Sequence, residues 1–97
     1  MEVTFEEILS KKVKAVGQTD DIKVVGTATV NKDGLVEQCD GTFYKVSDGQ
    51  GVGSFNRYGL NGDANTNMNV PFQYMMLCAT ALTEYVAGVE LTASKEN

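Results

Sequence analysis

The chain has 97 residues, of which 42% are hydrophobic and 22% charged, with a net charge of −5 and no histidine. This size and composition predict one soluble globular domain with a small core, and they argue against a disordered chain. The acidic balance argues against nucleic acid as a partner, because phosphate backbones are bound by clustered Lys and Arg.

The first residues, the uncharged runs and the cysteines argue against further classes of protein. The first residues lack the basic start and apolar core of a signal peptide, and no uncharged run is apolar enough to span a membrane, so cytoplasmic residence is the default expectation. Cys39 and Cys78 are too few for a disulfide scaffold and show no zinc-binding spacing. Neither has a basic neighbour to lower its thiol pKa. A redox sensor is therefore only a third functional class, and we expect no thiol-dependent change in mobility.

Residues 4–16 predict an amphipathic helix. Thr4 and Glu7 match a capping box, and Gly17 is suited to end the helix. Apolar residues recur between them at helical spacing, with lysines on the other side. The apolar positions are Phe5, Ile8, Leu9, Val13 and Val16.

Four strands are predicted next, at residues 22–30, 35–46, 51–60 and 64–70. They are rich in β-branched and aromatic residues or alternate between apolar and polar side chains. Turn residues separate them, and Asn61-Gly62 is the strongest hairpin signal, because its turn needs positive φ at both central positions. The sequence thus predicts a four-stranded antiparallel meander.

The Asn61-Gly62 turn also predicts a register. It pairs Arg57 with Thr66 and Phe55 with Met68 on a mostly apolar face. The alternating residues then form one contiguous polar, uncharged patch on the other face, which we call the amide patch. Its members are Ser54, Asn56, Tyr58, Asn65, Asn67 and Asn69.

A turn at Asp48-Gly49 predicts the preceding hairpin. It places Thr42 beside Phe55 and Asp40 beside Arg57, with Tyr44 over Gly53. In this register the apolar residues of the first two predicted strands lie on the opposite face of the sheet. A bulge at Asp40-Gly41 would reconcile the two halves. Alternatively, a helix covers each face, and the sequence does not distinguish these arrangements.

The last predicted element is a helix at residues 71–87. Pro71 suits its first turn and Gly88 its C-terminal cap, which makes residues 89–97 a candidate frayed tail. The helix is apolar nearly all round, so we expect burial on more than one side and a partner subunit as the second cover. The residues expected to form this contact are Phe72, Met75, Met76, Leu82, Tyr85 and Val86.

Two motifs resemble ligand sites. Asp63, Asn65 and Asn67 alternate as calcium ligands do, but Met68 and Tyr74 occupy the positions where a calcium loop needs Gly and a bidentate Glu. The glycine-rich stretch at 49–53 leads into a strand and contains no lysine, unlike a phosphate-binding loop. We interpret the first as a strand and the second as a hairpin, and we expect no metal or cofactor.

The sequence offers few residues suited to catalysis. The absence of histidine removes the usual general base and the Ser-His and Cys-His pairs. The acidic residues fall mostly in turns or on helix faces, where carboxylate pairs are solvated. The sequence therefore favours a non-catalytic protein.

The strongest functional signal is the absence of charge. Asp63 is the only charged residue between Tyr58 and Thr83, and depletion of charge with tyrosine present is typical of interfaces. The sequence predicts an α+β fold with an N-terminal helix, a four-stranded antiparallel β-meander and a C-terminal apolar helix packed on the sheet. We expect a self-associating interaction module, a homodimer, that can also bind a protein partner. The alternative is binding of a neutral polar ligand, a sugar or an extended peptide, on the Asn/Tyr face.

Overall fold

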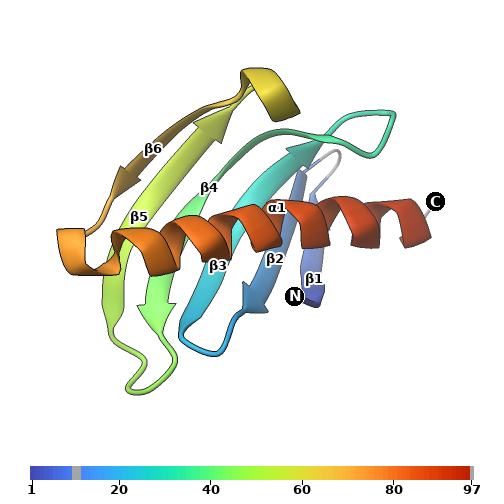
Figure 1. The fold of residues 1–97 in the computed structure, drawn as a ribbon. Coiled ribbons are helices and arrows are strands. Elements are labelled where there is room, and N and C mark those ends of the chain that lie inside the picture. Colours follow the sequence, from blue (N-terminus) through green and yellow to red (C-terminus); the bar gives the residue numbers. More distant parts are fainter. Residues whose placement is uncertain (10–11, 97) are drawn as a thin grey trace.

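The sheet is larger than predicted and carries a single helix. The computed structural model describes residues 1–9 and 12–96 as six antiparallel strands in sequence order, with one C-terminal helix packed on them (Figure 1). The α+β class and the helix on the sheet are confirmed. The elements are β1 (Val3–Leu9), β2 (Lys12–Gln18), β3 (Ile22–Val30), β4 (Val36–Lys45), β5 (Gly51–Tyr58), β6 (Asn65–Asn69) and α1 (Met75–Glu96). Short 3-10 turns lie at Asn61–Asp63 and Phe72–Tyr74.

The predicted N-terminal helix is wrong, because its residues form β1 and β2. In β2, Val13 and Ala15 are buried while Lys12 and Lys14 are exposed, which is the two-residue period of a strand. Pairing with β3 then buries that side of β2, since Val13 lies opposite the buried Ala28. Residues 10 and 11 of the predicted helix lie outside the described residues.

The four predicted strands are confirmed as β3 to β6, and the register of the last pair is confirmed. Arg57 lies opposite Thr66, and Phe55 opposite Met68. The connection is wider than a two-residue turn, because paired residues begin only at Tyr58 and Asn65. Between them Gly59 has a φ of 103°, and the 3-10 turn follows at Asn61–Asp63, where Gly62 has a φ of 37°.

The predicted β4–β5 register is wrong by one residue. Phe55 lies opposite Gly41, not Thr42, and Arg57 opposite Cys39, not Asp40. A one-residue shift turns every side chain of a strand to the other face. The pairing is regular through residues 40 and 41 and shifts between Phe43 and Tyr44 instead. The buried apolar residues of the strands therefore share one face without a bulge at Asp40-Gly41, while Val16 and Val25, which pair with each other, lie on the opposite face.

The core lies between that face and α1. Phe43 and Phe55 have ring centroids 5.0 Å apart, and Tyr85 of α1 packs edge-on against Phe55 at 6.2 Å. The Tyr85 hydroxyl donates a hydrogen bond to the Ala15 carbonyl oxygen at 3.0 Å, which pairs the one polar atom of a buried ring. In Figure 1, α1 crosses the strands on this face, and no described element covers the other face.

The predicted end of the helix at Ala87 with a cap at Gly88 is wrong. The helix continues to Glu96, through the residues for which a frayed tail was considered. Gly88 is buried where α1 approaches β1, and a Cβ there would lie 2.5 Å from Val3 Cγ2. The glycine therefore allows close packing against β1 and does not end the helix.

Candidate binding surfaces

The amide patch is assembled by the β5–β6 register. Asn56 lies opposite Asn67, and Tyr58 opposite Asn65. Asn67 Nδ2 donates a hydrogen bond to Asn56 Oδ1 at 3.0 Å, so the amides of these two members of the patch are already bonded to each other. These residues alternate with Phe55 and Arg57, which are buried beneath α1, so the patch lies on the uncovered face.

The sequence interpretation missed that polar side chains of β4, one of them the charged Asp40, border the uncharged amide patch. Thr42, Asp40 and Gln38 lie opposite Ser54, Asn56 and Tyr58 respectively. The missed signal is their alternation with Cys39 and Phe43, both of which are buried. The register error turned these three polar side chains toward the wrong face.

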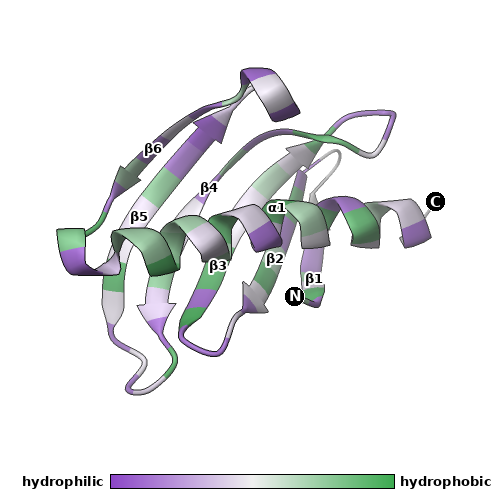
Figure 2. Ribbon diagram, viewed as in Figure 1, coloured by the Kyte–Doolittle hydropathy of each residue, from purple (hydrophilic) through white to green (hydrophobic). Residues whose placement is uncertain are grey.

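The 3-10 turn at Phe72–Tyr74 and the first residues of α1 expose a second surface, which we call the exposed start of α1. Phe72 is 91% exposed and Met76 83%, and Met75 and Leu77 are also exposed. Figure 2 shows this apolar end of the helix segment near the ends of β5 and β6. The other three residues expected at the oligomer contact, Leu82, Tyr85 and Val86, lie in the core between α1 and the sheet.

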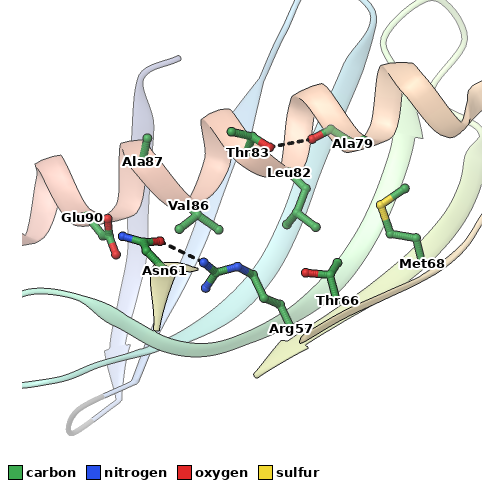
Figure 3. A pocket seen from close by; sticks show the side chains of 10 residues that line it. All are labelled: Arg57, Asn61, Thr66, Met68, Ala79, Leu82, Thr83, Val86, Ala87 and Glu90. Atoms are coloured by element: carbon green, nitrogen blue, oxygen red, sulfur yellow. Dashed lines mark hydrogen bonds between the residues drawn. The ribbon is translucent and has the colours of Figure 1, made fainter. Parts of the chain in front are cut away.

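A groove of about 450 Å³ opens between α1 and the β5–β6 end of the sheet (Figure 3). Its apolar wall comes mainly from Met68 of β6 and from Leu82 and Val86 of α1. Polar groups come from Arg57, Asn61, Thr66, Thr83 and Glu90, and the exposed Ala79 and Ala87 complete the rim. The sequence analysis singled out none of these as a ligand site.

Arg57 is the unusual residue of the groove. Its side chain is only 8% exposed, yet among the side chains that the structure describes no carboxylate forms an ion pair with it. The guanidinium donates through Nη2 to Asn61 Oδ1 at 3.0 Å and through Nη1 to the Gly59 carbonyl oxygen at 3.4 Å. Asp40, the partner expected from the sequence, lies on the opposite face. The hydrogen bonds of this buried cation that the structure describes are thus to neutral oxygens.

Among the residues that the structure describes, Glu90 is the one acidic residue that lines the groove, and it has its own partner. Its Oε2 accepts a hydrogen bond from the Val36 backbone N–H at 3.0 Å. In Figure 3, Asn61 lies between Glu90 and the Arg57 guanidinium, while Thr66, Leu82 and Met68 lie on the other side of the arginine. The two charges therefore occupy different parts of the groove.

The cysteines are buried and free. Burial raises the pKa of the Cys39 thiol to about 11, against a lowering by the Arg57 charge and a further rise from Asp40. Burial also raises the pKa of Cys78. Both thiols stay protonated at neutral pH and are therefore weak nucleophiles.

The calcium-like and glycine-rich motifs of the sequence form turns and strands in the structure. Asp63 belongs to the 3-10 turn, apart from the β6 strand that carries Asn65 and Asn67. The glycine-rich stretch forms a turn in which the Gly49 N–H donates to the Lys45 carbonyl oxygen at 2.8 Å, followed by β5. Within the described residues, no group of three or more Cys, Asp or Glu side chains is placed to hold a metal ion. None of the described helices has the length and hydropathy needed to cross a membrane.

Comparisons with protein-family models, with curated proteins and with solved structures find no match to this chain. Its function therefore has to be inferred from the three surfaces themselves, the amide patch, the exposed start of α1 and the groove at Arg57.

Proposed function

We propose that the protein is a non-catalytic interaction module that self-associates into a dimer through β6 and the exposed start of α1. The observation that carries this proposal is the exposure of Phe72 (91%) and Met76 (83%) directly after an uncharged edge strand. Contiguous apolar side chains of this size on a small domain are typical of contact sites.

The β6 edge supports the same conclusion. None of its five residues, Asn65–Asn69, is charged, and it pairs regularly with β5 on one side only. Natural sheets protect such edges with charged side chains, proline or bulges, because unpaired backbone groups recruit another strand. A second copy of this chain is the simplest partner, since addition of its own β6 satisfies both edges at once.

The proposed two-fold axis passes near Asn67, the middle residue of β6. Antiparallel self-pairing then sets Asn65 of one copy opposite Asn69 of the other. The same register brings Phe72 of one copy level with Gly62 of the second, beside Leu60, which is 44% exposed. The apolar start of α1 thus meets the exposed Leu60 beside this turn in a self-complementary contact, and the two amide patches join into one surface.

The test measures molar mass by light scattering coupled to size exclusion, at protein concentrations of tens of micromolar. The wild type should be a dimer, and Asn67→Lys and Phe72→Lys should each shift it to monomer. Loss of an interface anchor of about 2 kcal/mol weakens the dimer about thirty-fold. Thr4→Lys on the exposed side of β1 is the matched control and should leave the dimer unchanged. A wild-type monomer throughout this range would refute the proposal.

A second candidate is binding of a sugar or an extended peptide on the amide patch. It is favoured by the continuation of polar side chains from the amide patch on β5 and β6 onto β4, and by Tyr58, which is 52% exposed and able to stack on a ring. Amide groups both donate and accept hydrogen bonds, as a neutral polar ligand requires.

One triple variant separates the two candidates. Asn65→Ala, Asn67→Ala and Tyr58→Ala together remove the amide and ring groups while adding no charge to the edge. Loss of carbohydrate or peptide binding with the dimer intact supports the ligand candidate. Loss of the dimer supports the interface, and no change in either measurement contradicts a role for the patch.

A further inference from the structure

We infer that the groove at Arg57 binds a small organic carboxylate with an apolar tail. Nothing in this inference depends on self-association. Its basis is one juxtaposition: a buried guanidinium without an ion-pair partner among the described side chains lies beside an apolar wall formed by Leu82 and Met68.

Arg57 has the capacity to take the carboxylate. A guanidinium carries five N–H donors in a planar fork, and the described contacts of Arg57 are single bonds to Asn61 Oδ1 and to the Gly59 carbonyl oxygen. A carboxylate matches the fork with two parallel hydrogen bonds, which are charge-assisted and stronger than bonds to neutral oxygens. The Thr66 hydroxyl, which lies on the same rim, is a further donor for the anion.

The surrounding positions suit the tail. Leu82 and Met68 lie on the side of Arg57 away from Glu90, so an alkyl chain bound there is remote from the negative charge (Figure 3). The groove volume of about 450 Å³ lies within the range of about 300–1,000 Å³ found for small-molecule sites. Leu82 and Met68 offer no partner to a second carboxylate at the far end of such a chain, so the site selects monocarboxylates over dicarboxylates.

The two bonds of Arg57 also hold the site open. They tie the arginine to the turn between β5 and β6, and they keep its side chain in one orientation before a ligand arrives. Preorganisation of this kind reduces the entropy lost on binding. A purely structural arginine would make the same two bonds, so the experiment has to separate the two roles.

The probe is octanoate, used below the concentration at which it aggregates, with 1-octanol as the neutral compound of equal chain length. Titration calorimetry should show octanoate binding about ten- to a hundred-fold more tightly than octanol, because octanol lacks the charge-assisted bonds. Amide NMR signals of Thr66, Leu82 and Thr83 should shift on addition of octanoate. Suberate, the dicarboxylate of equal length, should bind several-fold more weakly than octanoate.

Two pairs of variants test the residues. Arg57→Met should abolish the preference for octanoate over octanol, whereas Glu90→Gln should keep it, since a glutamine oxygen still accepts the Val36 N–H. Because Arg57→Met also releases the turn, Ala79→Phe provides an independent block of the groove from an exposed position. Thr80→Phe adds the same ring one residue further on, outside the lining of this groove, and should leave octanoate binding unchanged.

Three results would overturn the inference. One is the absence of heat and of NMR shifts with octanoate on folded wild-type protein. Another is equal binding of octanoate and octanol, which would leave only an apolar groove. The third is unchanged octanoate binding in Ala79→Phe, which would place the ligand elsewhere and leave Arg57 as a structural link to the turn.

Discussion

The two edge strands of the sheet differ in charge, regularity and cover. β1 carries the exposed Glu6 and Glu7, and its pairing with β2 shifts between Phe5 and Glu7. The helix closes over this edge, where the Thr92 hydroxyl donates to the Val3 carbonyl oxygen at 3.2 Å. Charge and irregular pairing are the usual means by which sheets prevent edge-to-edge association.

The β6 edge has neither protection. Its five residues are uncharged and pair regularly with β5, and the helix packs mainly on β1 to β4. The groove at Arg57 opens beside this strand, and Phe72 and Met76 are exposed just beyond it. One end of the layered structure is thus closed by close packing, while the uncharged edge, the groove and the exposed apolar residues gather at the other.

The largest expected effect is at the closed end. Gly88→Val should lower the free energy of unfolding by about 3 kcal/mol, because added carbons collide with a packed core. The first of them, Cβ, would lie 2.5 Å from Val3 Cγ2 and 3.1 Å from the Met1 carbonyl oxygen. Urea unfolding followed by circular dichroism measures the change. Ala87→Val, an exposed neighbour on the same helix, should change the stability far less, and equal losses in the two variants would contradict close packing at β1.

The contrast between the edges also explains which predictions from sequence succeeded. The β5–β6 register follows from local signals, because Asn61-Gly62 marks the middle of the connection, although not as a two-residue turn, and Asn65, Asn67 and Asn69 alternate with less polar residues. The signal at Pro71 is equally local, although only the 3-10 turn begins directly after it and α1 begins four residues later than predicted, at Met75. These signals lie at the open end, where few tertiary contacts override them.

The failures lie where distant contacts decide. Phe5 and Val13 fit a helical period as well as a strand period, and only the pairing of β1 with β2 and of β2 with β3 selects the strand. Gly88 has the residue type of a helix cap, but the nearness of Val3 gives it a packing role. The Arg57 groove combines residues of β5, β6 and α1. The β4–β5 register decides whether Asp40 or Cys39 lies beside Arg57, and the predicted register was wrong by one residue. No local pattern contains this information.

A smaller effect should appear as a dependence of the free energy of unfolding on pH, which arises at Cys39. Cys39 lies opposite Arg57, and burial raises its pKa from 9.0 to about 11 in the folded protein. The folded state therefore favours the neutral thiol, and the stability that this provides is present below pH 9 and lost as the pH rises toward 11. A pKa shift of this size corresponds to a loss of about 2 kcal/mol in the free energy of unfolding by pH 11.

Urea unfolding at a series of pH values measures this loss. Cys39→Ala should be less stable at neutral pH but should show a flatter dependence between pH 9 and pH 10. Above pH 10 the buried Tyr85, whose pKa burial also raises, contributes a loss of the same sign. Arg57→Met should raise the pKa of Cys39 further, because the arginine charge lowers it. A dependence as steep in Cys39→Ala as in the wild type would contradict the assignment.

The smallest change in stability should come from removing the charges of β1. The same variant tests most directly whether these charges make the β1 edge differ from the β6 edge. Glu6→Thr with Glu7→Thr eliminates the exposed ion pair between Glu6 and Lys14, at 3.8 Å, so the free energy of unfolding should change by less than about 0.5 kcal/mol. The uncharged β1 edge should nevertheless gain the capacity to associate, which raises the molar mass measured by light scattering. Adding Asn67→Lys blocks β6 and isolates the new contact. If the double variant keeps the wild-type mass, the bulge and the cover by α1 protect β1 without help from its glutamates.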